Sequence, residues 1–450
     1  MKVSKFGGTS LATAEQIIKV CDIITSDTER SLVVVSAPGK RFKDDIKVTD
    51  LLINCANKFL DAGSAEVELN AIVCRYEEIA KGLGMKDEIV EVIENDLRSR
   101  LTKEIQDKEK FMDLLKAAGE DNSAKLIAAY LKSKGHDAKY INPKDAGLLL
   151  SDEYGNARVL PESYKNLKEL REYGGIAIFP GFFGYSKTGD VVTFPRGGSD
   201  ITGSILAAAV QADLYENFTD VDSVFVANPN IIQNPKSISV LTYREMRELS
   251  YAGFSVLHEE TLEPVYRMGV PVCIKNTNNP EGLGTTIVTE RNIHETGPVA
   301  GIACDNGFCS IYVSKYLMNR EVGFGRKLLN ILEDESISYE HIPSGIDDVS
   351  VIIREKGFSR DIENRILYRI KNELLADDAH VERNIAMVVL VGEGMNKKIG
   401  VAARATSALA RGNVNIEMVN QGTSEVSVLF GVKEWDSVSA VKALYEEFFE

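Results

Sequence analysis

Short β-branched runs alternate with longer segments of helical period along about the first 290 residues, and this alternation restricts the fold more than any other feature. The predicted strands are residues 3–6, 32–35, 176–179, 214–218 and 270–274. Between the first two strands, apolar side chains recur at helical spacing from Ile17 to Ile24. The pattern predicts βαβ units that build a mostly parallel sheet sandwiched by helices, an α/β fold.

Glycine-rich or polar loops follow four of these predicted strands directly. The loops are residues 5–10, 36–39, 180–184 and 219–222. In open parallel sheets, ligands bind beyond the carboxyl ends of the strands. We therefore expect the four loops to meet at one edge of the sheet and to form a binding site there.

The first loop combines a cation with a pair of glycines. Gly7 and Gly8 lack Cβ, so backbone N–H groups can approach an anion closely, and Lys5 adds a full positive charge. A helix that we expect to begin near Leu11 would point its positive end at the same place. The loop thus predicts a phosphate site, although it matches neither GxGxxG nor GxxxxGK[ST]. A plain strand–turn–helix junction with Ser10 as the N-cap explains the same residues.

A second glycine pair, Gly197 and Gly198, lies between Arg196 and Asp200 at the start of an alanine-rich helical run. A guanidinium group binds a carboxylate, and an acidic side chain binds an ammonium group, so this loop is suited to hold an amino acid. Asp200 also fits the first turn of a helix for electrostatic reasons alone.

Composition excludes several classes of protein. The chain has 52 Lys and Arg against 67 Asp and Glu, a net charge of −15, which argues against nucleic-acid partners and against an anionic membrane surface. The six cysteines form no CxxC pair, and five scattered histidines argue against a zinc site. Without a signal-like or membrane-spanning segment, we expect a soluble cytoplasmic protein.

The C-terminal third contains an internal repeat. Met318-Asn319 recurs as Met395-Asn396 with an offset of 77 residues, and the same offset relates Gly323 to Gly400 and Glu340 to Glu417. A gapless repeat means that one fold is used twice. In the first copy we predict strands at residues 309–313, 338–342, 349–354 and 379–383, with helices at residues 325–333 and 362–375, which gives a βαββαβ unit.

The second copy ends before its fourth strand. Its predicted strands are residues 386–391, 414–419 and 426–431, and its helices are residues 399–410 and 438–449. We expect residues 299–304 to supply the missing strand, so that the first copy is inserted in the second. The predicted domains are therefore residues 1–295, residues 305–383, and residues 298–304 together with 384–450, with the main boundary near Thr296-Gly297-Pro298.

An ordered set of motifs carries a family resemblance over nearly the whole chain. The motifs are KFGGTS, VVVSAPG, VTDLL, AGE, PGFFG, RGGSD, TDVD and VCIKNTNNPEGLGT. In this order they resemble an aspartokinase of the amino-acid-kinase fold with C-terminal ACT domains. The resemblance implies ATP-dependent phosphorylation of the L-aspartate side chain to 4-phospho-L-aspartate, the first step of lysine, threonine and methionine biosynthesis. It also implies Mg²⁺ bound with ATP, feedback inhibition by an amino acid, and a homodimer or homotetramer formed through the ACT units.

The resemblance also implies roles for individual residues. Lys5 and Asp200 would be catalytic, with Lys5 on the transferring phosphoryl group. The aspartate pocket would consist of Ser36, Thr49, Glu120, Phe182, Arg196, Gly197 and Ser199. Arg196 would hold the α-carboxylate of aspartate and Glu120 its ammonium group. The nucleotide would contact Gly7, Gly8, Ser10, Thr219, Asp220, Phe225, Lys275, Asn276 and Thr277. The charged helical region 65–116 would cap the aspartate site.

The predicted effector pocket resembles that of lysine-inhibited relatives. Its residues would be Met318, Gly323, Phe324, Gly325, Ser338, Tyr339 and Glu340. The charge of Glu340 suits a ligand ammonium group and favours lysine over threonine, although an exposed strand charge explains this residue equally.

Two departures from the family pattern keep alternatives open. Ser255 stands where many relatives have a lysine near the nucleotide, and Glu259 stands where they have proline. Lys275 is a candidate replacement for that missing cation. The missing lysine and the altered nucleotide loop at residues 225–230 make a non-catalytic amino-acid sensor an alternative interpretation. A kinase of the same fold that acts on another acidic amino acid is a second alternative, against which the paired regulatory units and the RGGSD motif argue.

Overall fold

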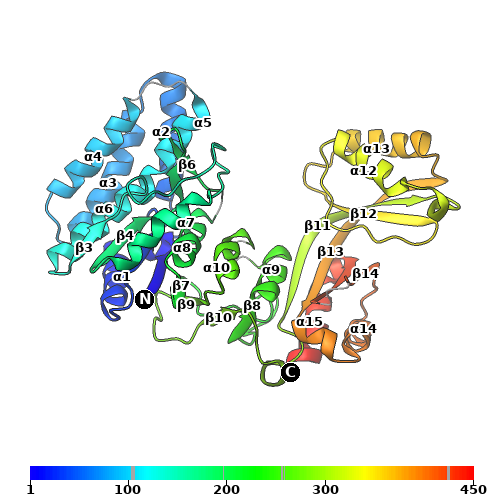
Figure 1. The fold of residues 1–450 in the computed structure, drawn as a ribbon. Helices are drawn as coiled ribbons and strands as arrows, with labels where there is room; N and C mark the ends of the chain where they lie inside the picture. Colours follow the sequence, from blue (N-terminus) through cyan, green and yellow to red (C-terminus); the bar gives the residue numbers. More distant parts are fainter. Residues whose placement is uncertain (103–106, 196, 255–256, 258, 423–425) are drawn as a thin grey trace. The chain divides into compact units, whose positions relative to one another are not determined.

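The computed structural model describes the chain except for residues 103–106, 196, 255–256, 258 and 423–425 (Figure 1). The chain divides into two compact units. Unit 1 comprises Met1–Val224, Ser237–Tyr243 and Ser255–Arg291, and unit 2 comprises Phe225–Lys236, Arg244–Phe254 and Asn292–Glu450. None of the helices in the described part of the chain is long and apolar enough to cross a membrane.

Unit 1 is built on an eight-stranded sheet with the order β3-β4-β2-β1-β7-β9-β10-β8. The strands are β1 (Lys2–Phe6), β2 (Leu32–Val35), β3 (Ala138–Tyr140), β4 (Ile176–Pro180), β7 (Leu214–Thr219), β8 (Val240–Thr242), β9 (Val272–Asn276) and β10 (Thr285–Val288). All neighbouring pairs are parallel except β9 with β10. The predicted mostly parallel sheet is confirmed, and β1, β2, β4 and β7 lie within one residue of their predicted bounds.

Helices cover both faces of this sheet (Figure 1). One face carries α1 (Ala14–Thr25) and α6 (Ala118–Ser133). Further out on the same side lie α2 (Val48–Ala62), α3 (Glu66–Gly82), α4 (Glu88–Leu101) and α5 (Lys108–Lys116). The other face carries α8 (Gly198–Ala209), flanked by α7 (Glu162–Leu167) and α10 (Glu263–Met268). A short hairpin, β5 (Phe183–Tyr185) with β6 (Val191–Thr193), forms a separate two-stranded sheet.

Strand register decides which side chains face which helices. Lys5 pairs with Asn217 of β7, and the next residue, Phe6, pairs with Phe218. Because successive side chains of a strand point to opposite faces, Lys5 and Asn217 face α8, whereas Phe6 and Phe218 face α1. The rings of Phe6 and Phe218 stack with centroids 4.8 Å apart in the core below α1.

The start of the first helix differs from the prediction. Residues Gly8–Leu11 form a 3₁₀ turn, and α1 begins only at Ala14, with Thr13 as the N-cap accepting a hydrogen bond from the Gln16 amide. Ser10 is therefore not an N-cap. Its hydroxyl lies 2.7 Å from that of Thr277, which is 267 residues away in the sequence, and this pairing was not visible in the local pattern.

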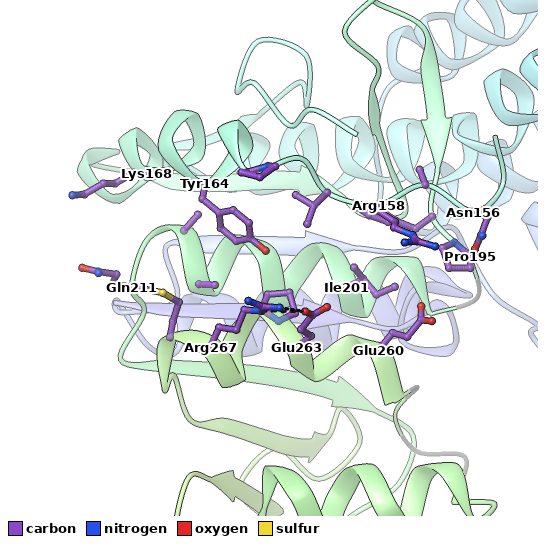
Figure 2. A pocket seen from close by; sticks show the side chains of 18 residues that line it. Asn156, Arg158, Tyr164, Lys168, Pro195, Ile201, Gln211, Glu260, Glu263 and Arg267 are labelled. Carbon is purple, nitrogen blue, oxygen red and sulfur yellow. Dashed lines mark hydrogen bonds and ion pairs between the residues drawn. The ribbon is translucent and has the colours of Figure 1, made fainter. Parts of the chain in front are cut away.

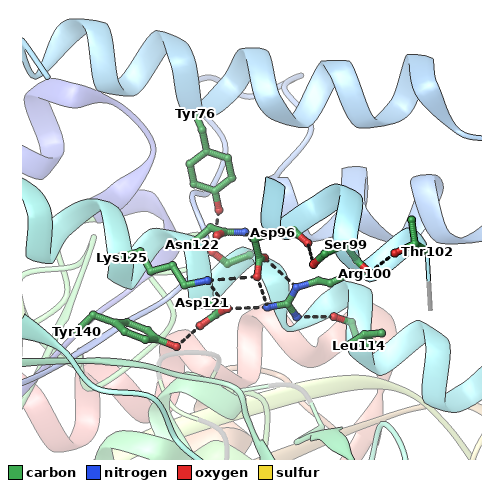
Figure 3. A network of polar contacts seen from close by, with 11 residues as sticks. Tyr76, Asp96, Ser99, Arg100, Thr102, Leu114, Asp121, Asn122, Lys125 and Tyr140 are labelled. Carbon is green, nitrogen blue, oxygen red and sulfur yellow. Dashed lines mark hydrogen bonds and ion pairs between the residues drawn. The ribbon is translucent and has the colours of Figure 1, made fainter. Parts of the chain in front are cut away.

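A network of buried ions joins α4 to α6 (Figure 3). The carboxylate of Asp121 accepts hydrogen bonds from Arg100 at 2.6 Å and Lys125 at 2.9 Å, and also from the Tyr140 hydroxyl. Arg100 additionally binds Asp96 at 2.8 Å. Because Asp121 directly follows Glu120 in α6, this network fixes the part of α6 that carries Glu120.

The Tyr140→Phe variant is expected to lower the free energy of unfolding of unit 1 by about 1.5 kcal/mol, because it removes one hydrogen bond to a charged group and leaves both cations on Asp121. Urea denaturation followed by circular dichroism measures the loss. The same change at the half-exposed Tyr266 is the control and should alter stability little. A Tyr140→Phe variant as stable as the parent would show that the hydroxyl contributes nothing.

Unit 2 contains a five-stranded antiparallel sheet with the order β12-β11-β13-β15-β14. Its strands are β11 (Gly301–Ser314), β12 (Asp348–Arg354), β13 (Asp378–Val391), β14 (Met418–Asn420) and β15 (Ser427–Lys433). The helices are α9 (Tyr243–Tyr251), α11 (Ile293–Thr296), α12 (Phe324–Asp334), α13 (Arg360–Glu373), α14 (Val401–Arg411) and α15 (Ser437–Phe449). The short 3₁₀ turns of this unit are η4 (Met318–Arg320), η5 (Glu393–Lys397) and η6 (Glu434–Asp436), whereas η2 (Lys168–Glu172) and η3 (Glu259–Leu262) belong to unit 1.

Two pairs of predicted strands are in fact single strands. Of the predicted strands 299–304 and 309–313, residues 301–304 and all of 309–313 belong to β11, whose pairing with β13 is irregular near Phe308. Residues 379–383 and 386–391 both belong to β13. At the N-terminal end of β11, Gly301 pairs with Val391. This is the segment that is expected to supply the fourth strand of the second copy.

Two other predicted strands are wrong or shortened. Residues 338–342 form no strand and have only an isolated bridge between His341 and Ile352, because Pro343 has no N–H to continue a ladder. Of residues 414–419, only the last two lie in β14.

Candidate active site

A buried ion pair lies at the carboxyl end of β1. The Lys5 ammonium contacts Oδ1 of Asp200 at 2.6 Å, and the two side chains are 8% and 18% exposed. A Cβ added to Gly7 would lie 3.5 Å from Lys5 Nζ, in ordinary van der Waals contact, so the first glycine of the loop lies directly beside the ammonium. The structure thus brings together the first glycine loop and the start of α8, as predicted for this edge of the sheet.

Two side chains of β7 hold Asp200 in place, and neither was predicted as a site residue. Asn217 Nδ2 donates to Asp200 Oδ1 at 2.7 Å, and the Tyr215 hydroxyl donates to the Asp200 backbone carbonyl at 3.0 Å. Both residues are buried. The adjacent polar residues Glu216 and Asn217 inside a predicted buried strand were the available signal, because such groups need partners when they are buried.

The glycines of the first two loops also serve loop packing. The Gly39 amide donates to the Gly8 carbonyl at 2.8 Å. A Cβ on Gly39 would lie 2.6 Å from the carbonyl carbon of Gly8, a distance that real Cβ atoms do not adopt. The loops after β1 and β2 are therefore in direct backbone contact.

Three predicted nucleotide residues meet beside this point. The Ser10 and Thr277 hydroxyls are 2.7 Å apart, and the Thr277 amide donates to the Thr219 carbonyl at 2.9 Å. Asp220 is exposed and accepts a hydrogen bond from the Thr219 hydroxyl at 3.2 Å, whereas Asn276 donates to Asp222 at 2.9 Å. The loops after β1, β7 and β9 thus converge.

Lys275 occupies the other face of the sheet. It pairs with Phe218, so its side chain points to the α1 face, opposite to Lys5. There it lines a cavity of about 560 Å³ together with Lys19 and Arg30. Its suggested part in nucleotide binding stays a prediction. Phe225 belongs to unit 2, Ser255 lies outside the described residues, and nothing is described of the Glu259 side chain.

The two predicted aspartate loops touch through their glycines. A Cβ on Gly198 would lie 2.6 Å from Cδ2 of Phe182, and one on Gly181 would lie 2.7 Å from Cβ of Ser199. Gly197 has φ +78°, which favours glycine, and Phe182 adopts φ +73°. Arg196, the predicted carboxylate ligand between these loops, lies outside the described residues.

Thr202 holds Phe182 in its left-handed conformation. Its buried hydroxyl accepts a hydrogen bond from the Phe182 amide at 3.0 Å and donates one to the Gly198 carbonyl at 2.8 Å. Thr202 was not predicted as a site residue, because its position in an alanine-rich helix gave no sign of these contacts.

Glu120 presents a buried carboxyl group beside the loop after β2. The residue is 5% exposed, the Ala37 amide bonds its carboxyl group, and Oε2 has no hydrogen-bond partner among the described residues. Burial raises the pKa of Glu120 to about 8, while the Ala37 amide acts in the opposite direction. A buried, unpartnered carboxyl oxygen is a suitable acceptor for a ligand's ammonium group.

Ser36 directly precedes Ala37, whose amide bonds this carboxyl group, and Thr49 lies in the helix that follows the same loop. The Ser36 amide donates to the Phe6 carbonyl at 3.2 Å, and Thr49 is in the first turn of α2. The N-cap of α2 is Lys47, without a side-chain capping bond, so Thr49 does not cap its helix. The Val48 amide donates to the Pro38 carbonyl, which holds α2 against the loop after β2.

A separate cavity of about 990 Å³ lies between α7, α8 and α10 (Figure 2). Tyr164 and Arg267 face each other across the outer side of α8, and Arg267 is paired with Glu263 at 2.7 Å. None of the described residues predicted for aspartate or nucleotide lines this cavity, so its size alone does not mark the active site.

The predicted effector residues lie in unit 2. Met318 and Phe324 are buried in its core, and Gly323 precedes α12 with φ +82°. Glu340 Oε1 accepts from Arg354 Nε at 3.3 Å, and its other oxygen accepts from the Tyr251 hydroxyl. Ser338 and Tyr339 precede Glu340 in irregular structure, and Tyr339 is half exposed. Glu340 is therefore already engaged within this unit.

The described residues include no group of three or more His, Cys, Asp or Glu side chains placed to hold a metal ion. A metal that enters on a nucleotide needs only one or two protein carboxylates, because the phosphate oxygens and water complete its coordination. Asp200 and the exposed Asp220, both at this edge of the sheet, are of the right chemistry for such a metal.

Comparisons with known proteins match both units. A model of the amino acid kinase family matches residues 1–276, and an ACT domain model matches residues 388–448. The chain is 58% identical to Aspartokinase 3 of Bacillus subtilis (strain 168) over 449 residues, which cover 100% of this chain and 99% of that protein.

Solved structures agree. Aspartate kinase of Clostridium acetobutylicum matches with a TM-score of 0.87 and 39% identity over 99% of each chain. E. coli aspartokinase III in complex with aspartate and ADP matches with a TM-score of 0.77 and 25% identity over the whole of both chains. Because these matches extend over both units, the chain belongs to the aspartokinase family and is an aspartate kinase with an allosterically regulated ACT part.

Proposed function

We propose that the chain transfers the γ-phosphoryl group of ATP to the side-chain carboxylate of L-aspartate, in a pocket at the carboxyl ends of β1, β2 and β7. The product is 4-phospho-L-aspartate, which would enter lysine, threonine and methionine biosynthesis. The observation that carries this proposal is the unpartnered carboxyl oxygen of Glu120 beside the loop that contacts Gly8. It offers an acceptor for an amino-acid ammonium group close to the predicted phosphate loop. The complex of E. coli aspartokinase III with aspartate and ADP supports the same pair of ligands.

The geometry suits a reaction without a general base. A carboxylate is ionised at pH 7, so one of its oxygens attacks the γ-phosphorus directly and ADP leaves. Catalysis then requires alignment of the two substrates and neutralisation of charge on the phosphoryl oxygens. The Lys5 ammonium group has three N–H donors. Asp200 accepts from one of them, so the other N–H groups can donate to the phosphoryl group.

Each remaining site residue has a proposed role. Asp200, held by Asn217, fixes the Lys5 ammonium, and Gly7 and Gly8 form the proposed phosphate loop, although the Gly7 amide itself donates to the Phe218 carbonyl at 3.1 Å. The aspartate pocket consists of Ser36, Thr49, Glu120, Phe182, Arg196, Gly197 and Ser199. Within unit 1, the proposed nucleotide contacts are Ser10, Thr219, Asp220, Lys275, Asn276 and Thr277. Mg²⁺ bound to ATP would neutralise further phosphate charge, with Asp200 and Asp220 as the carboxylates that suit it.

Trapping the acyl phosphate as its hydroxamate tests this activity. With ATP and Mg²⁺, aspartate should give hydroxamate, whereas glutamate and acetylglutamate should not. Hydroxamate from glutamate but not aspartate would assign another acidic substrate, and no hydroxamate with any of these acids would contradict the proposed reaction.

The regulatory part is proposed to bind lysine in preference to threonine. E. coli aspartokinase III has been solved in complex with lysine and aspartate, with a TM-score of 0.76 and 25% identity to this chain. The proposed pocket contains Met318, Gly323, Phe324, Gly325, Ser338, Tyr339 and Glu340. A bound lysine would share Glu340 with Arg354 and Tyr251.

If lysine binds there, the Glu340→Gln variant should need about tenfold more lysine for half-maximal inhibition, because it loses a charge-assisted hydrogen bond to the ligand ammonium. Dose–response curves of the hydroxamate assay measure this shift. Glu335→Gln in the same unit, which removes a carboxylate paired with Arg365, is the matched control and should leave the curve in place. Inhibition of the parent by threonine and not by lysine would overturn the assignment.

The domain bounds are proposed as residues 1–295 for the catalytic domain, 305–383 for the first ACT unit, and 298–304 with 384–450 for the second. The five-stranded sheet has β12 and β14 at its ends. Because open strand edges pair readily with another chain, we propose a homodimer or homotetramer formed through these ACT units. Light scattering of the full chain measures the oligomeric state.

A further inference from the structure

A buried carboxylate outside every sequence motif supports the loop that leads into the aspartate pocket. Asp113 of α5 is 1% exposed. Its Oδ2 accepts hydrogen bonds from the backbone amides of Thr193 and Gly155, both at 2.8 Å. Its Oδ1 accepts from the Thr193 hydroxyl at 2.9 Å and contacts the Lys116 ammonium at 2.7 Å. Each oxygen thus has two partners, and two of the four contacts come from Thr193.

Thr193 is the last residue of β6 and immediately precedes the predicted pocket loop, residues 194–199. Its carbonyl accepts a hydrogen bond from the Ala157 amide at 3.2 Å. The next amide, of Phe194, donates to the Phe182 carbonyl at 2.9 Å. Thr193 is therefore bound on both sides of its backbone, just where the chain enters the loop.

The hairpin that carries this loop needs such an anchor. β5 and β6 have three residues each and form a two-stranded sheet separate from the eight-stranded one. A two-stranded hairpin of this size is marginal in water unless it packs on other elements. At the β5 end, Tyr185 bonds Leu148 and Leu150 through its backbone. At the β6 end, Asp113 provides the corresponding attachment.

We propose that Asp113 is a positioning residue for phosphoryl transfer to aspartate. It does not touch the substrate, but it fixes Thr193 at the start of the predicted pocket loop and, through the adjoining Phe194 amide, the place of Phe182. This inference rests on the proposed function, because it takes that loop and Phe182 as the wall of the aspartate pocket. The proposed nucleotide loops follow β1, β7 and β9, and among the described residues the side chain of Asp113 bonds Thr193, Gly155 and Lys116 but none of these loops.

This separation predicts a selective kinetic effect. Displacing a substrate-positioning group by about 1 Å costs on the order of a hundredfold in rate. The Asp113→Asn variant keeps one acceptor oxygen but loses the ion pair with Lys116. We expect it to raise the aspartate KM about tenfold or more while the ATP KM changes less than about twofold. Thr193→Val removes the hydroxyl and should have the same effect, whereas Thr193→Ser retains the hydroxyl and should restore the parent KM.

The controls distinguish positioning from a general loss of folded enzyme. Glu109→Gln removes a charge from the exposed side of the same helix and should change neither KM. If a variant is merely less well folded, its preparation contains fewer active molecules, so the apparent kcat falls while both KM values stay unchanged. Unfolding midpoints of all four variants, measured in parallel, identify any variant that is not folded under assay conditions, and the Thr193 pair then decides.

An unchanged aspartate KM in both Asp113→Asn and Thr193→Val, or an equal rise in the ATP KM, would overturn the role of Asp113. A parent enzyme that traps no aspartyl hydroxamate would refute the proposed function, and this inference with it. An active parent with unaltered variants refutes only the positioning role.

Discussion

The Lys5→Met variant is expected to lower kcat by about 10²- to 10³-fold. Lys5 places a positive charge at the edge of the sheet where the glycine loops meet, and its ammonium is fixed by Asp200 at 2.6 Å in a largely buried site. A preorganised donor of this kind stabilises charge that develops in the transition state, and removal of one such donor typically costs this factor.

The loss should fall mainly on kcat. Phosphoryl oxygens gain their strongest contact with Lys5 during transfer, so the variant should bind ATP with a KM altered less than its kcat. Rates of ADP release at saturating aspartate and varied ATP concentration measure both kcat and the ATP KM. Arginine is not expected to replace Lys5, because its planar guanidinium group is larger and the site is 8% exposed.

Lys2 offers a matched control on the same strand. It forms a partly exposed ion pair with Asp27 at 2.7 Å, far from the carboxyl end of β1, so Lys2→Met should keep the parent kcat. A Lys5→Met variant that retained more than a tenth of the parent kcat would show that Lys5 does not act on the phosphoryl group.

The Glu120→Gln variant should raise the aspartate KM by about 30-fold or more. Loss of one partner of a buried charged pair costs about 2–5 kcal/mol, and the lower value corresponds to this factor. Glutamine keeps the shape and an acceptor oxygen but has no negative charge for the substrate ammonium. The exposed Glu109→Gln variant is again the control.

The parent should also show a pH dependence that the variant lacks. Burial raises the pKa of Glu120 to about 8, so in the free enzyme this carboxyl is mostly protonated at pH 6–7. Because the substrate ammonium binds the carboxylate form, the apparent aspartate KM should fall about tenfold per pH unit between pH 6 and 7 and level off above pH 8. A flat profile in the parent would contradict this role of Glu120.

Stability in the absence of aspartate should change in the opposite sense. The folded-state pKa of Glu120 lies above the ordinary value of 4.5, so the folded protein retains a proton that the unfolded chain has already lost. This group therefore weakens the fold progressively as pH rises from about 4.5 to about 8. Aspartate should stabilise the enzyme more strongly at pH 8 than at pH 6.

Local patterns were sufficient for much of the fold. The apolar runs located β2 and β4 because a fully buried parallel strand needs a continuous apolar segment, and β1 and β7 were located as well although they carry buried polar residues such as Ser4 and Asn217. Local patterns predicted the wrong structure where a single backbone group decided it. At residues 338–342 no strand forms, because Pro343 lacks the N–H that would continue the ladder. Local patterns also placed the first helix too early, because a 3₁₀ turn and an α-helix share the same residue types.

The site was predictable only in part. Lys5, Gly7, Gly8 and Asp200 were identified from motifs, and the structure places them together. Asn217, Thr202 and Asp113 were not, because each acts through a contact with a residue 17 to 80 positions away in the sequence. The motif also gave no indication that Lys275 lies on the opposite face of the sheet from Lys5, since that depends on the register of β9 against β7.

The sequence by itself determined the order of the elements, the repeated C-terminal fold and the residue types of an aspartokinase, because apolar periodicity and glycine requirements act over a few neighbouring residues. Only the tertiary structure decided which side chains meet. The ion pair of Lys5 with Asp200 and the anchoring of Thr193 by Asp113 depend on strand register and helix packing, and these are set by the whole core rather than by any local segment.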